Sequence, residues 1–121
     1  MQTLTIVTIL FWILAAAFII PNYIQGIQKI ILQKEKVETF RGWHLSLRFM
    51  QLLGVVEVVG ATLLIFPATR FITIPIYAIL LSGAVYIHRK NNDTVKNTMV
   101  PVFVGIHLAV LLLVNAWMMH L

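Results

Sequence analysis

Four long apolar segments dominate the chain, and short polar stretches separate them. The segments cover residues 3–25, 45–66, 71–88 and 98–119. A helix needs about 20 predominantly apolar residues to cross a bilayer, so this pattern predicts four transmembrane helices. No connecting stretch is long enough for a second domain. The expected fold is therefore all-α, a single transmembrane four-helix bundle that occupies residues 1–121.

The connections between the segments contain signals for turns and for helix starts. Residues 67–70, Pro-Ala-Thr-Arg, allow only a tight hairpin between the second and third segments. Residues 89–97 form a polar loop before the fourth segment. Asn97 or Thr98 is expected to cap that helix, because such side chains accept hydrogen bonds from the free N–H groups of a helix start.

The composition excludes several classes of protein. Of the 121 residues, 60% are hydrophobic and only 11% are charged, whereas a soluble domain is about half apolar and about a quarter charged. The chain is therefore neither a soluble globular domain nor a disordered one. It contains no cysteine, which excludes disulfides, thiolate metal sites and thiol chemistry of its own.

The charged residues gather at one end of the predicted bundle. Eight basic residues lie in or next to the loops 26–44 and 89–97, and only Arg70 lies toward the other end. Because cytoplasmic loops of membrane proteins are rich in Lys and Arg, we expect both loops in the cytoplasm and both termini outside it. A bacterial plasma membrane is the default. The net charge of +5 then reflects topology, and no nucleic-acid partner is expected. The eight residues are Lys29, Lys34, Lys36, Arg41, Arg48, Arg89, Lys90 and Lys96.

Glu57 is the main candidate for a functional residue, because it lies deep in the second apolar segment. A carboxylate at that depth costs several kcal/mol unless it is paired, protonated or in contact with water. Gly54, Glu57 and Ala61 share one helical face, with Gly60 beside it. Small residues let another helix approach closely, so Glu57 is expected to face the bundle. It either holds neighbouring helices together by hydrogen bonding, or binds a ligand or handles protons.

A polar stripe marks the cytoplasmic end of the first segment. Asn22, Gln25, Gly26 and Lys29 follow one another at i, i+3, i+4 and i+7, which places them on one helical face. Two interpretations remain open. The stripe either lines a polar pocket, or it is the interfacial end of a helix whose lysine extends toward the headgroups.

Further polar candidates lie in the third and fourth segments. His107 and His88 are positioned to hydrogen-bond Glu57 or a ligand carbonyl, or to relay protons. No two histidines have the i, i+4 spacing of a metal site, so no metal is expected. Asn115 is expected to form an interhelical hydrogen bond. Trp12, near the middle of the first segment, is expected to be a packing residue.

Three short stretches resemble the DoxX-like family of small membrane proteins. They are Gly-Ile-Gln-Lys at residues 26–29, Gly-Val-Val-Glu-Val-Val-Gly-Ala at residues 54–61 and Tyr-Ile-His-Arg at residues 86–89. The resemblance implies a four-helix bundle with Lys29, Glu57 and His88 as matching polar positions. Some members of the family are similar to the small subunit of a thiosulfate:quinone oxidoreductase, some accompany thiol-linked redox partners, and animal relatives resemble receptor-assembly chaperones. The lack of cysteine separates this chain from any thiol-based version.

Three functions follow as hypotheses. The first is a protein that is not catalytic by itself, an accessory or assembly protein that binds a membrane-protein partner, a second copy of itself or a small lipophilic molecule, with Glu57 as its buried polar anchor. The second is a membrane subunit of a quinone-linked oxidoreductase, whose redox centre belongs to a partner and for which quinone is the candidate cofactor. The third is a proton-coupled carrier that uses Glu57 and His107. No catalytic residue is identified.

Overall fold

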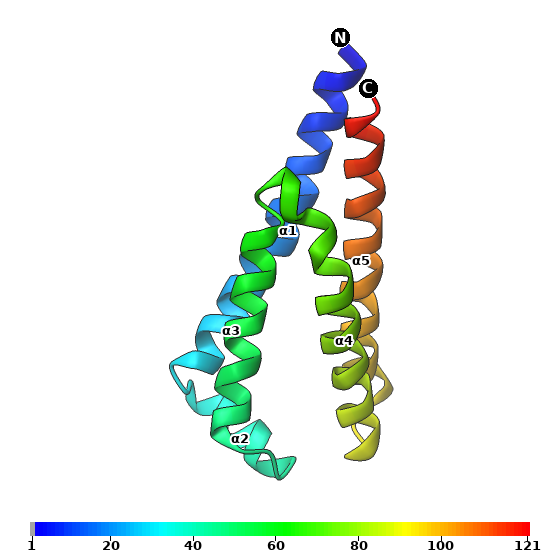
Figure 1. The fold of residues 1–121 in the computed structure, drawn as a ribbon. Helices are drawn as coiled ribbons and strands as arrows, with labels where there is room; N and C mark the ends of the chain where they lie inside the picture. Colours follow the sequence, from blue (N-terminus) through cyan, green and yellow to red (C-terminus); the bar gives the residue numbers. More distant parts are fainter. Residues whose placement is uncertain (1) are drawn as a thin grey trace.

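The protein is an all-α helical bundle, as predicted. A computed structural model describes residues 2–121, and its helices are α1 (Gln2–Ile30), α2 (Lys34–Gly42), α3 (Leu47–Leu63), the 3-10 helix η1 (Pro67–Ile72), α4 (Thr73–Lys90) and α5 (Val95–Met119). Helix α1 packs along α3 and α5, and α4 packs along α5. The two termini lie at one end of the molecule, and α2 and the α4–α5 turn lie at the other end (Figure 1).

Three stretches of helix are long and apolar enough to cross a membrane, namely α1, the η1–α4 stretch and α5. A fourth candidate arises only if α2 and α3, which meet at a bend of 120°, form one broken span. Helix α3 alone has 17 residues and is about 26 Å long, slightly less than the ~30 Å of a hydrocarbon core. The structure therefore contains three or four candidate spans.

The C-terminal ends of the helices differ from the expected ends of the apolar segments. Helix α1 does not end near Gln25. It continues through Pro21 to Ile30, and the N–H of Gln33 then donates to the carbonyl of Gln28 (2.9 Å). Leu32 takes the left-handed conformation (φ 58°) that this type of helix end requires. Helix α4 likewise extends past the expected end of its segment to Lys90.

The helix starts also differ from the expected positions. The hydroxyl of Thr94 accepts a hydrogen bond from the N–H of Asn97 (3.1 Å), so Thr94 is the cap and α5 begins at Val95. The prediction that Asn97 or Thr98 caps this helix is wrong. Ser46 caps α3 in the same way through the N–H of Phe49 (3.1 Å). The predicted hairpin at residues 67–70 is part of the 3-10 helix η1.

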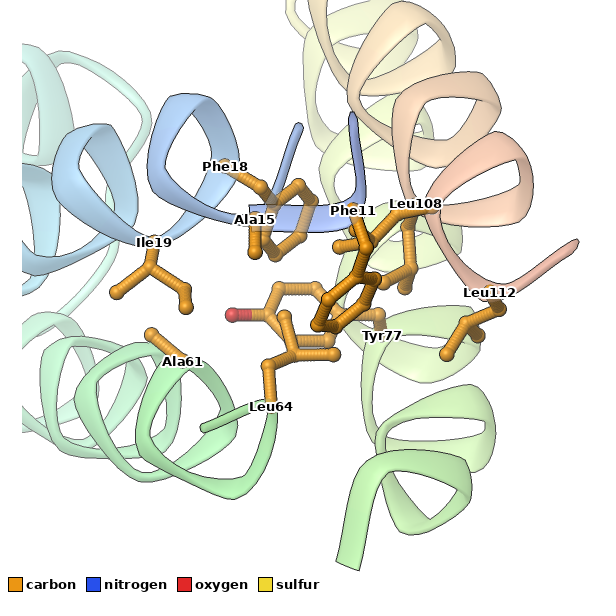
Figure 2. Packing of buried hydrophobic residues seen from close by; sticks show 10 residues of the cluster. Phe11, Ala15, Phe18, Ile19, Ala61, Leu64, Tyr77, Leu108 and Leu112 are labelled. Carbon is orange, nitrogen blue, oxygen red and sulfur yellow. The ribbon is translucent and has the colours of Figure 1, made fainter. Parts of the chain in front are cut away.

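The apolar core lies where α1, α3, α4 and α5 converge (Figure 2). Tyr77 of α4 is 1% exposed, and its ring packs edge-on against Phe18 of α1 with 5.2 Å between ring centroids. Gly60 of α3 makes room for this ring, because a Cβ atom there would lie 2.7 Å from Cε2 of Tyr77. The cluster consists of Phe11, Ala15, Phe18, Ile19, Ala61, Leu64, Tyr77, Leu108, Leu111 and Leu112.

Candidate functional site

Glu57 of α3 forms an ion pair with Lys29 of α1. The two side chains are 13% and 15% exposed, respectively. A carboxylate and an ammonium group that neutralise each other can share a poorly hydrated position that neither could occupy alone at low cost. The structure thus places two of the six predicted site residues in direct contact, although they lie 28 positions apart in the chain.

Two glycines bring the backbones of α1 and α3 together next to this ion pair. A Cβ atom on Gly54 would lie 2.5 Å from the carbonyl oxygen of Gly26, and one on Gly26 would lie 2.8 Å from the carbonyl oxygen of Gly54. Such distances leave no room for a side chain on either residue. Lys29 lies three residues after Gly26, and Glu57 lies three residues after Gly54. Because the two helices run in opposite directions (Figure 1), each charged residue lies beside the glycine of the other helix: a Cβ atom on Gly54 would lie 3.0 Å from Cβ of Lys29, and one on Gly26 would lie 3.4 Å from Cβ of Glu57. The two charged side chains then meet across the close crossing.

A polar network continues from the ion pair toward the apolar core. The hydroxyl of Tyr77 lies 3.4 Å from the backbone carbonyl oxygen of Glu57 and 3.4 Å from Oδ1 of Asn22. The amide nitrogen of Asn22 donates to the carbonyl of Phe18 (2.8 Å) within α1. Asn22, from the predicted polar stripe, is thus linked to α3 through a tyrosine of α4.

A pair of hydroxyl groups also joins α1 to α3. The hydroxyls of Tyr23 and Thr62 lie 2.6 Å apart. Because the Thr62 hydroxyl donates to the carbonyl of Val58 (2.8 Å), Tyr23 is the donor in this pair. The buried face between the two helices therefore carries paired polar groups, which costs far less than leaving them without partners.

The rest of the polar stripe lies toward α2. The side-chain oxygen of Gln25 accepts a hydrogen bond from Nζ of Lys36 on α2. Gln51 of α3 donates to the carbonyl of Ile30 at the end of α1 (2.9 Å). The first bond joins α2 to α1, and the second joins α3 to the end of α1.

The two histidines lie away from Glu57. Nε2 of His107 donates to the carbonyl of Leu14 on α1 (3.0 Å), and its ring packs edge-on against Phe18. His107 is thus part of the α1–α5 contact. The hydrogen bond of Glu57 with either histidine, which the sequence left open, is not formed in this structure, where Lys29 is the ionic partner of Glu57.

His88 lies at the end of α4 and pairs with Asp93 in the following turn, with 2.6 Å between Nδ1 and Oδ2. The ring of Trp43, beyond the end of α2, packs edge-on against His88 with 5.0 Å between centroids. Hydrogen bonds from His88, Asn97 and the N–H of Thr94 hold the pKa of Asp93 below its ordinary value. This cluster connects the α2 region to the α4–α5 turn.

Arg70 is the buried charged residue that the sequence analysis missed. The sequence places it in the short connection 67–70, but it is 2% exposed. Its Nε donates to the carbonyl of Leu64 (2.9 Å), its Nη1 to Oδ1 of Asn115 (3.0 Å) and its Nη2 to the carbonyl of Ile65 (3.3 Å). The interhelical hydrogen bond predicted for Asn115 is thus present.

Aromatic rings complete the surroundings of Arg70. Its guanidinium carbon lies 4.3 Å from the ring centroid of Phe11 and 5.3 Å from that of Trp12, distances typical of cation–π contacts. Trp12 is 43% exposed, so it flanks this cluster instead of packing in the core as expected.

Two grooves lie outside the ion-pair region. An apolar groove of about 510 Å³ runs between α4 and α5. A second groove of about 400 Å³ lies at the α4–α5 turn and includes Arg89, Asn92 and Thr98. Within residues 2–121, no three His, Cys, Asp or Glu side chains gather in a way that could hold a metal ion.

Apolar helices of membrane-spanning length around a few paired polar groups define a small all-α integral membrane protein. Residues 6–114, nearly the whole chain, match the sequence model of the DoxX-like family, and the chain belongs to that family. The resemblance found at residues 26–29, 54–61 and 86–89 is thus confirmed at the level of the family. No curated protein and no solved structure matches the chain.

Proposed function

We propose that this protein is an accessory membrane protein that binds a transmembrane helix of a partner along the groove between α4 and α5. The observation that carries the proposal is the lining of that groove, which is almost entirely apolar and includes the small residues Ala78, Gly105, Ala109 and Ala116. Between transmembrane helices, small residues allow close backbone approach and extensive packing contacts.

The shape of the groove favours a helix as its occupant. Gly105, Ala109 and Ala116 follow one another along α5 at i, i+4 and i+11, so they stay close to one face over about 16 Å. Larger side chains, among them Ile74 and Leu113, line the same groove. Ridges formed by large side chains beside a stripe of small ones match the ridges-into-grooves packing of a further helix.

The Lys29–Glu57 pair supports a structural role for Glu57 within this proposal. Its carboxylate already has an ionic partner, and His107 is hydrogen-bonded to Leu14 instead. A carrier that moves protons between Glu57 and His107 would need these groups to communicate. The contacts of the two residues therefore favour an anchor between α1 and α3 over a proton relay.

A small lipophilic molecule is the second candidate for the same groove. The volume of about 510 Å³ falls within the roughly 300–1,000 Å³ typical of small-molecule sites. Tyr77 lines this groove, and its hydroxyl also reaches the polar network around Glu57. A quinone, the candidate cofactor of the sequence analysis, belongs to this chemical class.

The test is to extract the full chain from its native membrane with mild detergent, and to identify what remains bound. Ala109→Leu fills the groove, and the matched control Val110→Leu adds the same kind of side chain at a neighbouring exposed position. We expect a stoichiometric protein partner, or a second copy, with the wild type and with Val110→Leu, and its loss with Ala109→Leu. The proposal fails if the protein is isolated alone, or if Ala109→Leu retains the partner. A quinone or other lipid that only Ala109→Leu releases would establish the second candidate.

A further inference from the structure

The end of the molecule formed by α2, the start of α3 and the α4–α5 turn is strongly basic. We refer to it as the basic end. It carries seven basic and three acidic residues, a net charge of +4, whereas among residues 2–121 the half of the molecule with both termini has the buried Arg70 as its only Lys, Arg, Asp or Glu. The basic residues are Lys34, Lys36, Arg41, Arg48, Arg89, Lys90 and Lys96, and the acidic ones are Glu35, Glu38 and Asp93.

We propose that the basic end binds the anionic headgroups of the surrounding lipid bilayer, chiefly through Arg89, Lys90 and Lys96. All three side chains are exposed. Throughout residues 2–121 the ion pairs are Lys29–Glu57 and His88–Asp93, so none of the seven basic residues is neutralised by a carboxylate in contact. Asp93, the acid nearest to the three, is already engaged by His88.

Exposed apolar residues beside these cations favour a lipid surface over a soluble acidic partner. Val95 is 80% exposed next to Lys96, and Tyr86 is 64% exposed one turn before Lys90. Ile31 is 67% exposed three residues before Lys34, at the other side of the basic end. Apolar and aromatic side chains interleaved with lysine and arginine are typical of segments that sit at the headgroup boundary, with the apolar groups inserted and the cations at the phosphates.

The α4–α5 turn also provides space for a headgroup. The groove of about 400 Å³ there is lined by Arg89, Asn92 and Thr98, together with Asp93 and two apolar residues. A phosphodiester in this groove would have Arg89, Asn92 and Thr98 among its neighbours, together with the two apolar residues. Basic residues close to an anionic leaflet attract its lipids, and this attraction weakens as salt screens it.

The test uses the full chain reconstituted in phosphatidylcholine bilayers with trace spin-labelled phosphatidylglycerol or spin-labelled phosphatidylcholine. The measured quantity is the fraction of each label whose motion the protein restricts. We expect the association constant of phosphatidylglycerol to exceed that of phosphatidylcholine by about threefold or more at low salt, and the two to converge at high salt. The triple variant Arg89→Gln/Lys90→Gln/Lys96→Gln should lose this preference.

The matched control is Glu35→Gln/Glu38→Gln, which neutralises exposed acids on α2 and should preserve or increase the preference. Equal restriction of both labels by the wild type would overturn the proposal, and would be the result if the basic end served an acidic protein or a nucleic acid. A preference that survives in the triple variant would also overturn the assigned residues. If the triple variant does not insert into the bilayers, the single variant Lys96→Gln and the salt dependence of the wild type replace it. The preference for phosphatidylglycerol should then be weaker in Lys96→Gln and should disappear at high salt in the wild type, and the absence of both effects would overturn the proposal. The groove between α4 and α5 is not involved, so this outcome is independent of the proposed function.

Discussion

Replacing Lys29 by methionine removes the ionic partner of Glu57 while keeping a flexible apolar side chain of similar length. Both side chains of the pair are mostly buried, at 15% and 13% exposure. Loss of one partner from a buried pair costs about 3–5 kcal/mol, because the other charge is left without compensation. Residual exposure of the two side chains reduces this cost, so we expect Lys29→Met to lower the free energy of unfolding by about 3 kcal/mol.

The double variant Lys29→Met/Glu57→Leu provides the decisive comparison. It removes both charges together, and exchange of a buried ion pair for apolar side chains is often close to neutral. We therefore expect the double variant to be more stable than Lys29→Met alone. The assay is reversible unfolding of the full chain in mixed micelles with increasing sodium dodecyl sulfate, followed by far-ultraviolet circular dichroism.

Lys34→Met is the matched control, because Lys34 is exposed and outside any ion pair in the described chain. It should change the free energy of unfolding by less than about 0.5 kcal/mol. Glu57→Leu is measured alone to complete the comparison. If the loss of stability in the double variant equals the sum of the losses in Lys29→Met and Glu57→Leu, the two charges do not stabilise each other. The interpretation of Glu57 as an anchor between α1 and α3 would then be refuted.

Three further predictions concern packing, buried charge and pH. Gly54→Ala should destabilise the protein by about 1–3 kcal/mol, because the added Cβ would lie 2.5 Å from a carbonyl oxygen of α1; unfolding in mixed micelles measures this. Arg70→Leu should cost about 3 kcal/mol or more in the same assay, because it removes the donor from two buried acceptors and one part-buried acceptor. The pKa of Asp93 is lowered chiefly by the hydrogen bond with His88, so its contribution to stability is complete above the unfolded-state pKa of about 4 and is lost as pH falls through the lower folded-state value. The difference in unfolding free energy between wild type and Asp93→Asn should accordingly shrink as the pH falls below about 4.

Each of these predictions has its own control or contrary outcome. Gly83→Ala adds the same methyl group where nothing lies within 4 Å of the new atom, and should stabilise α4 by up to about 1 kcal/mol. Equal effects at Gly54 and Gly83 would contradict the close crossing. Arg70→Leu without a loss of stability would mean that the guanidinium bonds contribute nothing. An Asp93→Asn difference that persists unchanged to pH 2 would contradict the lowered pKa.

Local sequence was sufficient to predict the four long helices α1, α3, α4 and α5, because long apolar runs and the scarcity of turn residues act within each segment. It did not predict α2, which lies within the expected loop 26–44. Local sequence was not sufficient to predict the residues at which the long helices end. Helix α1 ends through a left-handed residue that is Leu32, and α4 ends in the same way through Asn92. Neither position has the glycine that usually marks such an end, and Gly26, the glycine near the expected end of α1, instead contacts α3.

The candidate site was only partly accessible from sequence. The depth of Glu57 and the small residues on its helical face follow from spacing, which indicated that the carboxylate faces another helix. The identity of its partner did not follow, because His88 and His107 were the expected hydrogen-bond partners and the residue that pairs with Glu57 is Lys29. The backbone contact between Gly26 and Gly54 brings Lys29 to Glu57, and that contact depends on how two separate helices cross.

Arg70 shows most clearly which features follow from the sequence and which depend on the tertiary structure. The sequence by itself determined an all-α membrane protein with its basic residues concentrated at one end, because hydropathy and charge act segment by segment. It placed Arg70 in an exposed turn, since a charge beside Pro-Ala-Thr is normally solvated. Tertiary structure alone decided that η1 turns this guanidinium inward, against Phe11 and toward Asn115, 45 residues away. A buried charge needs donors, acceptors and aromatic faces from several helices at once, and only the packed bundle brings them together.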